Sequence, residues 1–237
     1  MQLQQILFSQ GFGTRRICAG LIQQGLVEIA GNVRTDPLEE VDPEGLRFSV
    51  QGREWPFHAK AYLMLHKPAG YECSQKPSAW PSIYTLLPGP VRQRPGPPGV
   101  QAIGRLDQDT TGLLLLSDDG TFIHRMSSPR HHVPKVYEAV TKHPIDARQV
   151  ERLLAGVVLD DDPKPVRASA CEAAGEQLLR LTLTEGKYHQ VKRMVAAVGN
   201  RVEGLHRSRI GGLELPADMA PGQWRWLDTA ELALLRA

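Results

Sequence analysis

Two short apolar runs on either side of a charged loop constrain the fold of this chain more than any other feature. Val100–Ile103 and Leu113–Leu116 are apolar runs with polar neighbours, a pattern typical of buried strands. The loop between them carries Arg105 and Asp107. Because strands anchor both of its ends, the loop can present charged groups from a rigid base. The pattern predicts a functional loop, although a tight turn whose Asp and Thr side chains only satisfy backbone groups would use the same residues.

The composition is that of an ordinary globular protein. The chain has 237 residues, of which 41% are hydrophobic and 23% charged, enough for one large core and a small accessory domain. No apolar run approaches the roughly 18 residues that span a membrane, and the first residues lack the charged-then-apolar plan of a signal peptide. The three cysteines are far apart without metal-ligand spacing. We therefore expect a cytoplasmic protein with no membrane partner and no structural metal.

Strand-like segments outnumber helical ones beyond residue 60, which predicts a mixed α+β domain. The expected strands are 61–66, 100–103, 113–116, 134–141, 166–172, 177–184, 202–205 and 209–215. The expected helices are 120–127, 146–155, 187–198 and 229–236. Pro88–Gly99, with five prolines, is expected to be an irregular exposed loop that closes over the substrate.

Five segments carry a resemblance to a known family. Gly104–Asp107 followed by Thr110–Leu116 resembles the catalytic motif of RNA pseudouridine synthases. The other segments resemble further motifs of that family, in the family's order: Tyr62–Gly70, Lys135–Ala139, Glu185–Met194 and Leu205–Gly212. Ser128–His132 and His189–Met194 are most similar to the bacterial enzymes that modify small-subunit (16S) ribosomal RNA. The resemblance spans roughly residues 60–228, and it implies a catalytic domain with a mainly antiparallel mixed sheet.

This resemblance implies a reaction and a mechanism. The implied activity is isomerisation of one uridine of 16S rRNA, position 516 in the usual numbering, to pseudouridine. The base has to be flipped out of the folded RNA, and an ionised carboxylate can act as nucleophile. By resemblance that carboxylate is Asp107, and Tyr137 stacks on the uracil. The isomerisation involves no redox change, so we expect no cofactor and no metal.

Lys192 is the expected partner of Asp107. Within the predicted helix 187–198, Val191, Met194, Val195 and Val198 follow helical spacing and define the buried face. At about 100° per residue, Lys192 flanks that face while Arg193 points towards solvent. A neighbouring cation favours the ionised form of a carboxyl group. The resemblance to the family's third motif also indicates Lys192 as the partner of Asp107, although the usual residue of the family at this position is arginine. Arg193 is expected to contact an RNA phosphate.

Several further residues are expected to contact RNA. Arg105 fills the vacated stack or holds a phosphate, the alternative being a bracing role for the backbone, and Leu205 lines the uracil pocket. Residues 180–209 carry seven Lys/Arg against two acids, a plausible phosphate footprint that includes Arg207 and Arg209. His131 and His132 are adjacent and without a completing ligand, so RNA contact is expected there rather than metal.

Residues 1–52 are expected to form a separate RNA-binding domain, joined by a linker, 53–60, to the catalytic domain, 61–237. Its helix–helix–strand plan resembles the S4-type domain of related synthases. Thr14 is the expected cap of a helix that buries Ile17, Leu21 and Ile22 and presents Arg15 and Arg16. Residues 1–59 carry a net charge of −2, so any RNA contact depends on a small patch, and a purely structural role is the alternative.

Three functions remain open from the sequence. The first is a monomeric synthase acting on 16S rRNA, either naked or within a small-subunit assembly intermediate. The second is a sibling enzyme that modifies 23S rRNA with the same two domains. The third is a non-catalytic RNA-binding ribosome-assembly factor, against which the presence of Asp107, Tyr137 and Lys192 argues.

Overall fold

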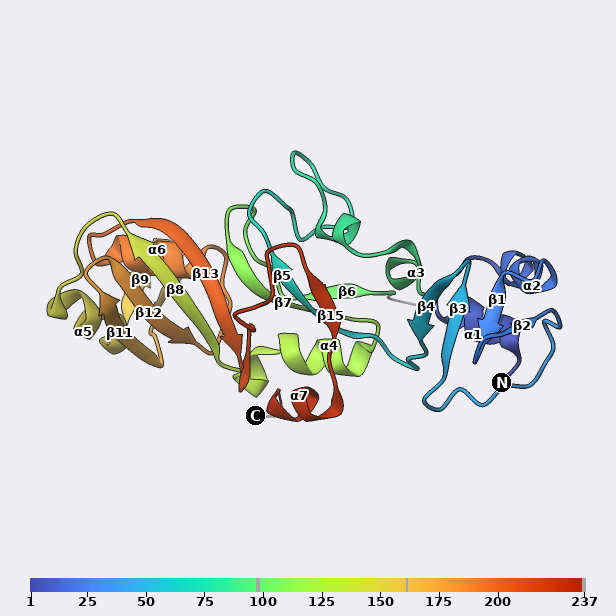
Figure 1. The fold of residues 1–237 in the computed structure, drawn as a ribbon. Helices are drawn as coiled ribbons and strands as arrows, with labels where there is room; N and C mark the ends of the chain where they lie inside the picture. The colour runs from blue at the N-terminus through green and yellow to red at the C-terminus, as the bar shows by residue number, and fades with distance from the viewer. Residues whose placement is uncertain (97–98, 161, 236–237) are drawn as a thin grey trace. The chain divides into compact units, whose positions relative to one another are not determined.

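The computed structural model describes residues 1–96, 99–160 and 162–235. Its contacts divide the chain into two compact units, which are considered one at a time. Unit 1 comprises 1–62, 87–101 and 116–120, and unit 2 comprises 63–86, 102–115 and 121–237. The α+β class expected from the sequence is confirmed (Figure 1). No helix among the described residues is long and apolar enough to cross a membrane.

Unit 1 begins with two helices and a four-stranded sheet (Figure 1). The helices are α1 (Leu3–Ser9) and α2 (Arg15–Gln23). The strand order is β2-β1-β3-β4, with β1 Val27–Ile29, β2 Asn32–Arg34, β3 Arg47–Val50 and β4 Arg53–Pro56. Strand β4 pairs antiparallel with β3, so the first half of the stretch expected to be a linker belongs instead to this sheet.

The second helix starts as the sequence predicts, and its buried face is predicted in part. The Thr14 hydroxyl accepts a hydrogen bond from Ile17 N at 3.3 Å and so caps α2. Ile22 is fully buried and Leu21 is half-buried, in line with the expectation. The expectation that Ile17 points inwards is wrong, since it is 52% exposed, and Cys18 is fully buried in its place.

The proline-rich segment of unit 1 is more ordered than expected. Residues 97–98 of this segment lie outside the described residues. Gly89–Arg92 forms the short helix α3, with proline in its first turn, where the missing amide hydrogen costs nothing. The expectation of a wholly irregular, exposed loop is therefore wrong, and Val91 is buried.

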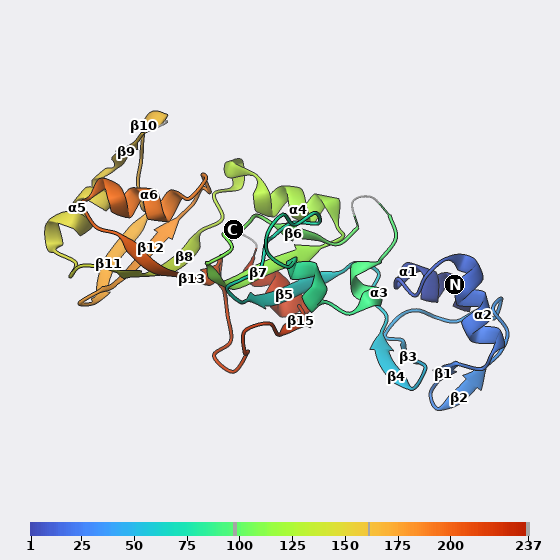
Figure 2. The same cartoon turned by 90° about the horizontal axis from the view of Figure 1, so that it is seen from above.

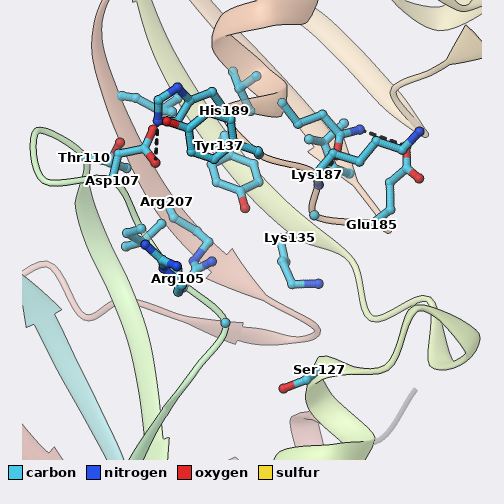
Figure 3. A pocket seen from close by; sticks show the side chains of 18 of the residues that line it. Arg105, Asp107, Thr110, Ser127, Lys135, Tyr137, Glu185, Lys187, His189 and Arg207 are labelled. Atoms are coloured by element: carbon cyan, nitrogen blue, oxygen red, sulfur yellow. Dashed lines mark hydrogen bonds and ion pairs between the residues drawn. The ribbon is translucent and has the colours of Figure 1, made fainter. Parts of the chain in front are cut away.

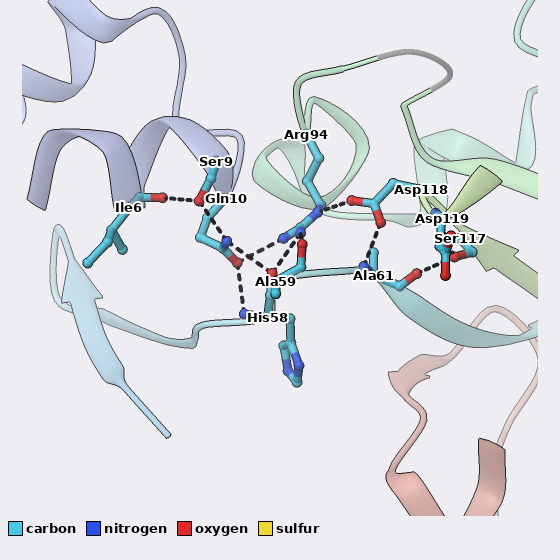
Figure 4. Close-up of polar contacts among 10 residues, drawn as sticks. All are labelled: Ile6, Ser9, Gln10, His58, Ala59, Ala61, Arg94, Ser117, Asp118 and Asp119. Atoms are coloured by element: carbon cyan, nitrogen blue, oxygen red, sulfur yellow. Dashed lines mark hydrogen bonds and ion pairs between the residues drawn. The ribbon is translucent and has the colours of Figure 1, made fainter. Parts of the chain in front are cut away.

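A buried arginine ties this segment to the rest of unit 1 (Figure 4). Arg94 is 5% exposed and forms an ion pair with Asp118 at 2.7 Å. Its guanidinium also donates to Gln10 Oε1 at 2.8 Å and to the His58 carbonyl at 2.7 Å. Asp118 in turn accepts from the amide of Ala61 at 2.7 Å. These bonds join the end of α1, the chain at 58–61 and the residues that follow Leu116.

Unit 2 is organised around the long sheet, with strand order β11-β12-β8-β13-β7-β5-β15 (Figures 1 and 2). The strands are β5 Tyr62–Lys67, β6 Gln101–Ile103, β7 Thr111–Ser117, β8 Lys135–Thr141, β11 Ala170–Gly175, β12 Leu178–Leu183, β13 Val202–Ile210, β14 Leu213–Glu214 and β15 Trp224–Trp226. Strand β13 pairs antiparallel with β8 and parallel with β7, so the expected mixed, mainly antiparallel sheet is confirmed. A separate hairpin is formed by β9 (Val157–Leu159) and β10 (Asp162–Val166), which the sequence analysis did not predict.

The helices of this part of the chain are α4 (Gly120–Ser127), α5 (Ala147–Ala155), α6 (Gln190–Ala197) and α7 (Thr229–Leu234), with 3₁₀ turns at Ile83–Leu86 and Pro129–His131. Helix α6 contacts β9 and β13 (Figure 2). It begins three residues later than expected, because His189 takes the left-handed conformation at φ 49°. Residues 202–210, expected as parts of two strands, form one strand with a register shift between Arg207 and Arg209.

Candidate active site

One pocket of unit 2, of about 450 Å³, is lined by five of the ten site residues that the sequence analysis predicted: Arg105, Asp107, Tyr137, Leu205 and Arg207 (Figure 3). Its floor is one face of β8 and β13. In the antiparallel register Tyr137 lies opposite Arg207, and Ala139 opposite Leu205. Because side chains alternate along a strand, Lys135 shares the face of Tyr137. The walls come from the loop after β6, the end of α4, and the residues before and at the start of α6.

Asp107 lies in the loop between β6 and β7, as expected, and faces two basic side chains. Lys192 Nζ is 3.1 Å from Asp107 Oδ2, and His189 Nε2 is 3.3 Å from Oδ1. The Asp107 side chain is 28% exposed, so the carboxylate is held but still accessible from the pocket. The ion pair that the helical phase of Lys192 predicts is present in the structure.

Asp109 shares the ammonium group of Lys192 and was not singled out by the sequence analysis. Its Oδ1 accepts a hydrogen bond from Lys192 Nζ at 2.7 Å. Partial burial acts to raise the pKa of Asp109, but the hydrogen bond and charge of Lys192 outweigh it, and the pKa lies below its usual range. The pKa of Lys192 is raised, because its two carboxylate partners outweigh the opposing effect of burial. One lysine thus bridges two carboxylates of the same loop.

His189 is the second residue that the sequence analysis left without a role. Its left-handed conformation is uncommon for a residue other than glycine, and such conformations often occur at functional sites. The imidazole stacks on the ring of Tyr188 with centroids 3.7 Å apart. The available signal was the position of His189 in the family-like segment, three residues before Lys192.

Lys67 holds the loop that carries Asp107 in place, and the sequence analysis gave it no role. The side chain is fully buried, and Nζ donates to the carbonyls of Thr110 at 2.8 Å, Pro68 at 3.0 Å and Gln108 at 3.2 Å. Burial lowers the pKa of Lys67. A lysine at the end of an apolar strand was the signal, since a buried ammonium has to find several acceptors.

The predicted RNA-binding residues have different surroundings in unit 2. Leu205 is half-buried and lines the pocket, and Arg105 is exposed at its wall. Arg193 is half-buried rather than solvent-facing and donates to the Tyr188 carbonyl at 3.1 Å. Arg209 is exposed and lies 3.6 Å from Glu214.

The basic residues of the phosphate footprint expected over 180–209 are divided between the pocket and the surface of unit 2. Arg207 is 2% exposed and belongs to the pocket. Arg180 pairs with Glu172 at 2.9 Å and Arg201 with Glu203 at 3.1 Å, so acids neutralise part of the footprint. The local charge excess counted along the sequence therefore overstates the positive charge that this surface presents.

In unit 1, Arg15 and Arg16 are both exposed at the start of α2, as expected. The Arg15 guanidinium lies over the ring of Phe8, 5.2 Å from its centroid. The exposed helix start leaves both cations accessible to a ligand.

Comparisons with known proteins assign the chain to a family. Residues 61–197 match the RNA pseudouridylate synthase family, and residues 1–45 match the S4 domain. Proteins named ribosomal small subunit pseudouridine synthase A are 36% identical in Pasteurella multocida, over 98% of both chains, and 39% identical in Yersinia pestis, over 100% of this chain and 99% of the other. A crystal structure of a pseudouridylate synthase superposes with a TM-score of 0.68 at 32% identity and covers 99% of both chains. The chain therefore belongs to the RNA pseudouridylate synthase family and is an RNA pseudouridine synthase with an S4 domain.

Proposed function

We propose that this protein converts a single uridine of small-subunit (16S) ribosomal RNA, position 516, into pseudouridine. The observation that carries the proposal is the Asp107 carboxylate, held between Lys192 and His189 at the wall of a pocket large enough for a nucleotide. The names of relatives that match this chain over almost its whole length supply the choice of RNA.

The proposed mechanism follows from the surroundings of Asp107. The reaction breaks the bond between N1 of uracil and C1′ of the ribose and forms a bond from C5 to C1′; C5 then loses its proton and N1 gains one, so the product is an isomer of the substrate. Asp107 acts as the nucleophile; the Lys192 ammonium favours its charged form, and the contacts of Lys192 and the His189 imidazole orient it. Tyr137, 8% exposed on the pocket floor, stacks on the flipped uracil, and Leu205 packs beside it.

The proposal assigns different roles to the two domains. Residues 1–52 dock RNA through Arg15 and Arg16, and residues 61–237 carry the chemistry, with Arg105, Arg193 and Arg209 contacting the RNA backbone. The substrate is 16S rRNA, naked or within a small-subunit assembly intermediate. We place the protein in the cytoplasm, because ribosomal RNA is made and assembled there in bacteria such as those of its relatives. We further propose that it acts as a monomer.

The proposed function is tested by mapping pseudouridine after incubation with purified 16S and 23S rRNA separately. Wild-type protein is expected to modify 16S rRNA at one site, and Asp107→Asn to lower the single-turnover rate at least about a thousandfold. RNA binding by Asp107→Asn should stay near wild type, because phosphate contacts carry most of the affinity. Asp109→Asn is the matched control, since it removes a carboxylate from the same loop without removing the nucleophile.

Modification of 23S rRNA instead would establish the sibling function, and a single-turnover rate of Asp107→Asn within about tenfold of wild type would overturn the role of Asp107. The same assay with Arg15→Glu and Arg16→Glu tests docking. We expect about a tenfold higher RNA concentration at half-maximal rate, with little change at saturation. A loss that persists at saturation would contradict a docking role.

A further inference from the structure

We propose that the pocket holds, besides the uridine, a backbone phosphate next to it, bound at a positive end formed by Lys135 and Arg207 with Arg105 at the rim. This inference rests on the proposed function and names the part of the substrate that this end of the pocket recognises. Figure 3 shows the three side chains on the opposite side of Tyr137 from His189.

The sheet register places Lys135 and Arg207 on one face. Arg207 of β13 lies directly opposite Tyr137 of β8, and Lys135 precedes Tyr137 by two residues. The positive charge of Arg207 acts on Lys135, so the two groups lie close enough to influence each other. Two long basic side chains on one face of one pocket can meet a phosphate between them. Both residues line the pocket.

Neither cation is neutralised by the protein. Among the residues that the structure describes, Lys135 and Arg207 form no ion pair with a carboxylate. Lys135 Nζ donates only to the Val133 carbonyl at 3.0 Å, which leaves two of its hydrogens for a ligand. Arg207 Nε donates to the Leu113 carbonyl at 2.8 Å, whereas the buried Nη2 has no partner within the described part of the chain.

The two charges act on each other. Burial lowers the pKa of Lys135, and the positive charge of Arg207 lowers it further. A buried unpaired cation is unfavourable, and two that repel are more so. A bound anion would satisfy Lys135 and Arg207 together, which explains why the fold keeps them in one pocket.

The ligand is a phosphate rather than the base, because uracil is neutral and needs no cluster of cations. The lysine and arginine side chains of the pocket exceed its carboxylates by two charges. Both carboxylates are engaged, Asp107 with Lys192 and Glu185 with the Gln190 side chain at 2.8 Å. The surplus positive charge is available to the RNA backbone.

The first test changes the substrate and leaves the protein intact. Two short 16S rRNA fragments carry an uncharged methylphosphonate, one on the 5′ side and one on the 3′ side of the target uridine. Wild-type protein is expected to bind one of them about tenfold more weakly than the unmodified fragment. Equal affinity for all three fragments would overturn the phosphate site. Pseudouridine formation on the unmodified fragment tests the proposed function separately.

The second test combines the methylphosphonate substitution in the RNA with substitutions of Lys135 in the protein. Lys135→Met should weaken binding of the unmodified fragment about tenfold, but add less than about twofold on the sensitive methylphosphonate fragment, because the missing charge is already gone. Lys135→Arg should restore the affinity. Lys142→Met, an exposed lysine just after β8 and outside the pocket, is the control and should bind all fragments as wild type does.

If Lys135→Met weakens binding of the sensitive methylphosphonate fragment as much as it weakens binding of the unmodified fragment, Lys135 and the phosphate act independently. That result would overturn the proposal. Arg207→Met is measured in parallel, with its melting temperature, since Arg207 is buried. If Arg207→Met stays folded, it is expected to lose the same sensitivity to the methylphosphonate. A folded Arg207→Met that keeps full sensitivity would remove Arg207 from the site.

Discussion

Two buried arginines, one in each unit, have opposite surroundings. Arg94 of unit 1 is 5% exposed and meets a carboxylate, a side-chain amide and a backbone carbonyl (Figure 4). Arg207 of unit 2 is 2% exposed, donates to one carbonyl, and keeps Nη2 without a partner among the described residues (Figure 3).

The difference between the two arginines indicates which of them stabilises the fold and which is available to bind a ligand. A buried charge whose hydrogen-bonding capacity is used up by the protein contributes to the fold, and removing it leaves its partners unpaired. A buried charge that the protein leaves open stabilises little and is available for a ligand. The comparison predicts stability defects around Arg94 and activity defects around Arg207.

The largest effect on stability is expected at Arg94. Arg94→Met leaves Asp118 buried without its cation, which should lower the free energy of unfolding by about 3–5 kcal/mol. Arg207→Met should lower it by less than about 1.5 kcal/mol: the Leu113 carbonyl loses its donor and the guanidinium contact over the Tyr137 ring, 6.0 Å from its centroid, is lost, but the repulsion of Lys135 is relieved. Urea denaturation measures both, and Arg92→Met, an exposed residue of α3, serves as the control.

Equal losses in the Arg94 and Arg207 variants would break the comparison. A related consequence concerns a chain that begins at Lys60. Such a chain lacks Gln10 and the His58 and Ala59 carbonyls that satisfy Arg94, so its defects would combine instability with lost RNA docking. The charge reversal at Arg15 and Arg16 therefore separates docking from folding better than a truncation does.

The next largest effect is expected on the single-turnover rate when Lys192 is replaced. Lys192→Met leaves Asp107 and Asp109 as two facing carboxylates without their shared cation, and we expect the single-turnover rate to fall about a hundredfold. Arg193→Met should instead weaken RNA binding and reduce its dependence on salt. Rates at saturating RNA, together with affinities at two salt concentrations, distinguish the two variants. An exchange of the two phenotypes would place the catalytic partner on Arg193.

The smallest effect is on the pH dependence of stability, at the fully satisfied carboxylate Glu72. Backbone amides of Ala79, Ser78 and Trp80 donate to it and hold its pKa at about 2, below the usual 4.5. Because the pKa is depressed in the folded state, Glu72 adds stability above pH 4.5, and this is lost as the pH falls towards 2.

Urea denaturation at pH 6 and pH 3 should show Glu72→Gln less stable than wild type at pH 6, with a smaller difference at pH 3. Glu151→Gln, on the exposed side of α5, removes the same charge without removing a carboxylate bound by backbone amides, and serves as the control. A constant difference between wild type and Glu72→Gln at the two pH values would contradict the role of the ionised carboxylate.

Much of the fold follows from local patterns. Hydrophobic runs predicted β7 and β8, and helical spacing predicted α4, α5 and the side of α6 from which Lys192 reaches Asp107. Capping chemistry predicted the start of α2 at Thr14. These features depend on residues within a few positions of each other, and that is why the sequence was sufficient.

The sequence by itself determined the family-like order of motifs, the position of Asp107 in a loop between two strands, and the helical phase of Lys192. Only the tertiary structure decided the roles of the basic residues. Arg207 and Arg209 are two apart and would share one face of a regular strand. The register shift between them instead leaves Arg207 in the pocket and Arg209 exposed. Whether a charge is satisfied, as at Arg94, or left open, as at Arg207, depends on partners far away in the chain, such as Gln10, Asp118 and Leu113, which no local pattern specifies.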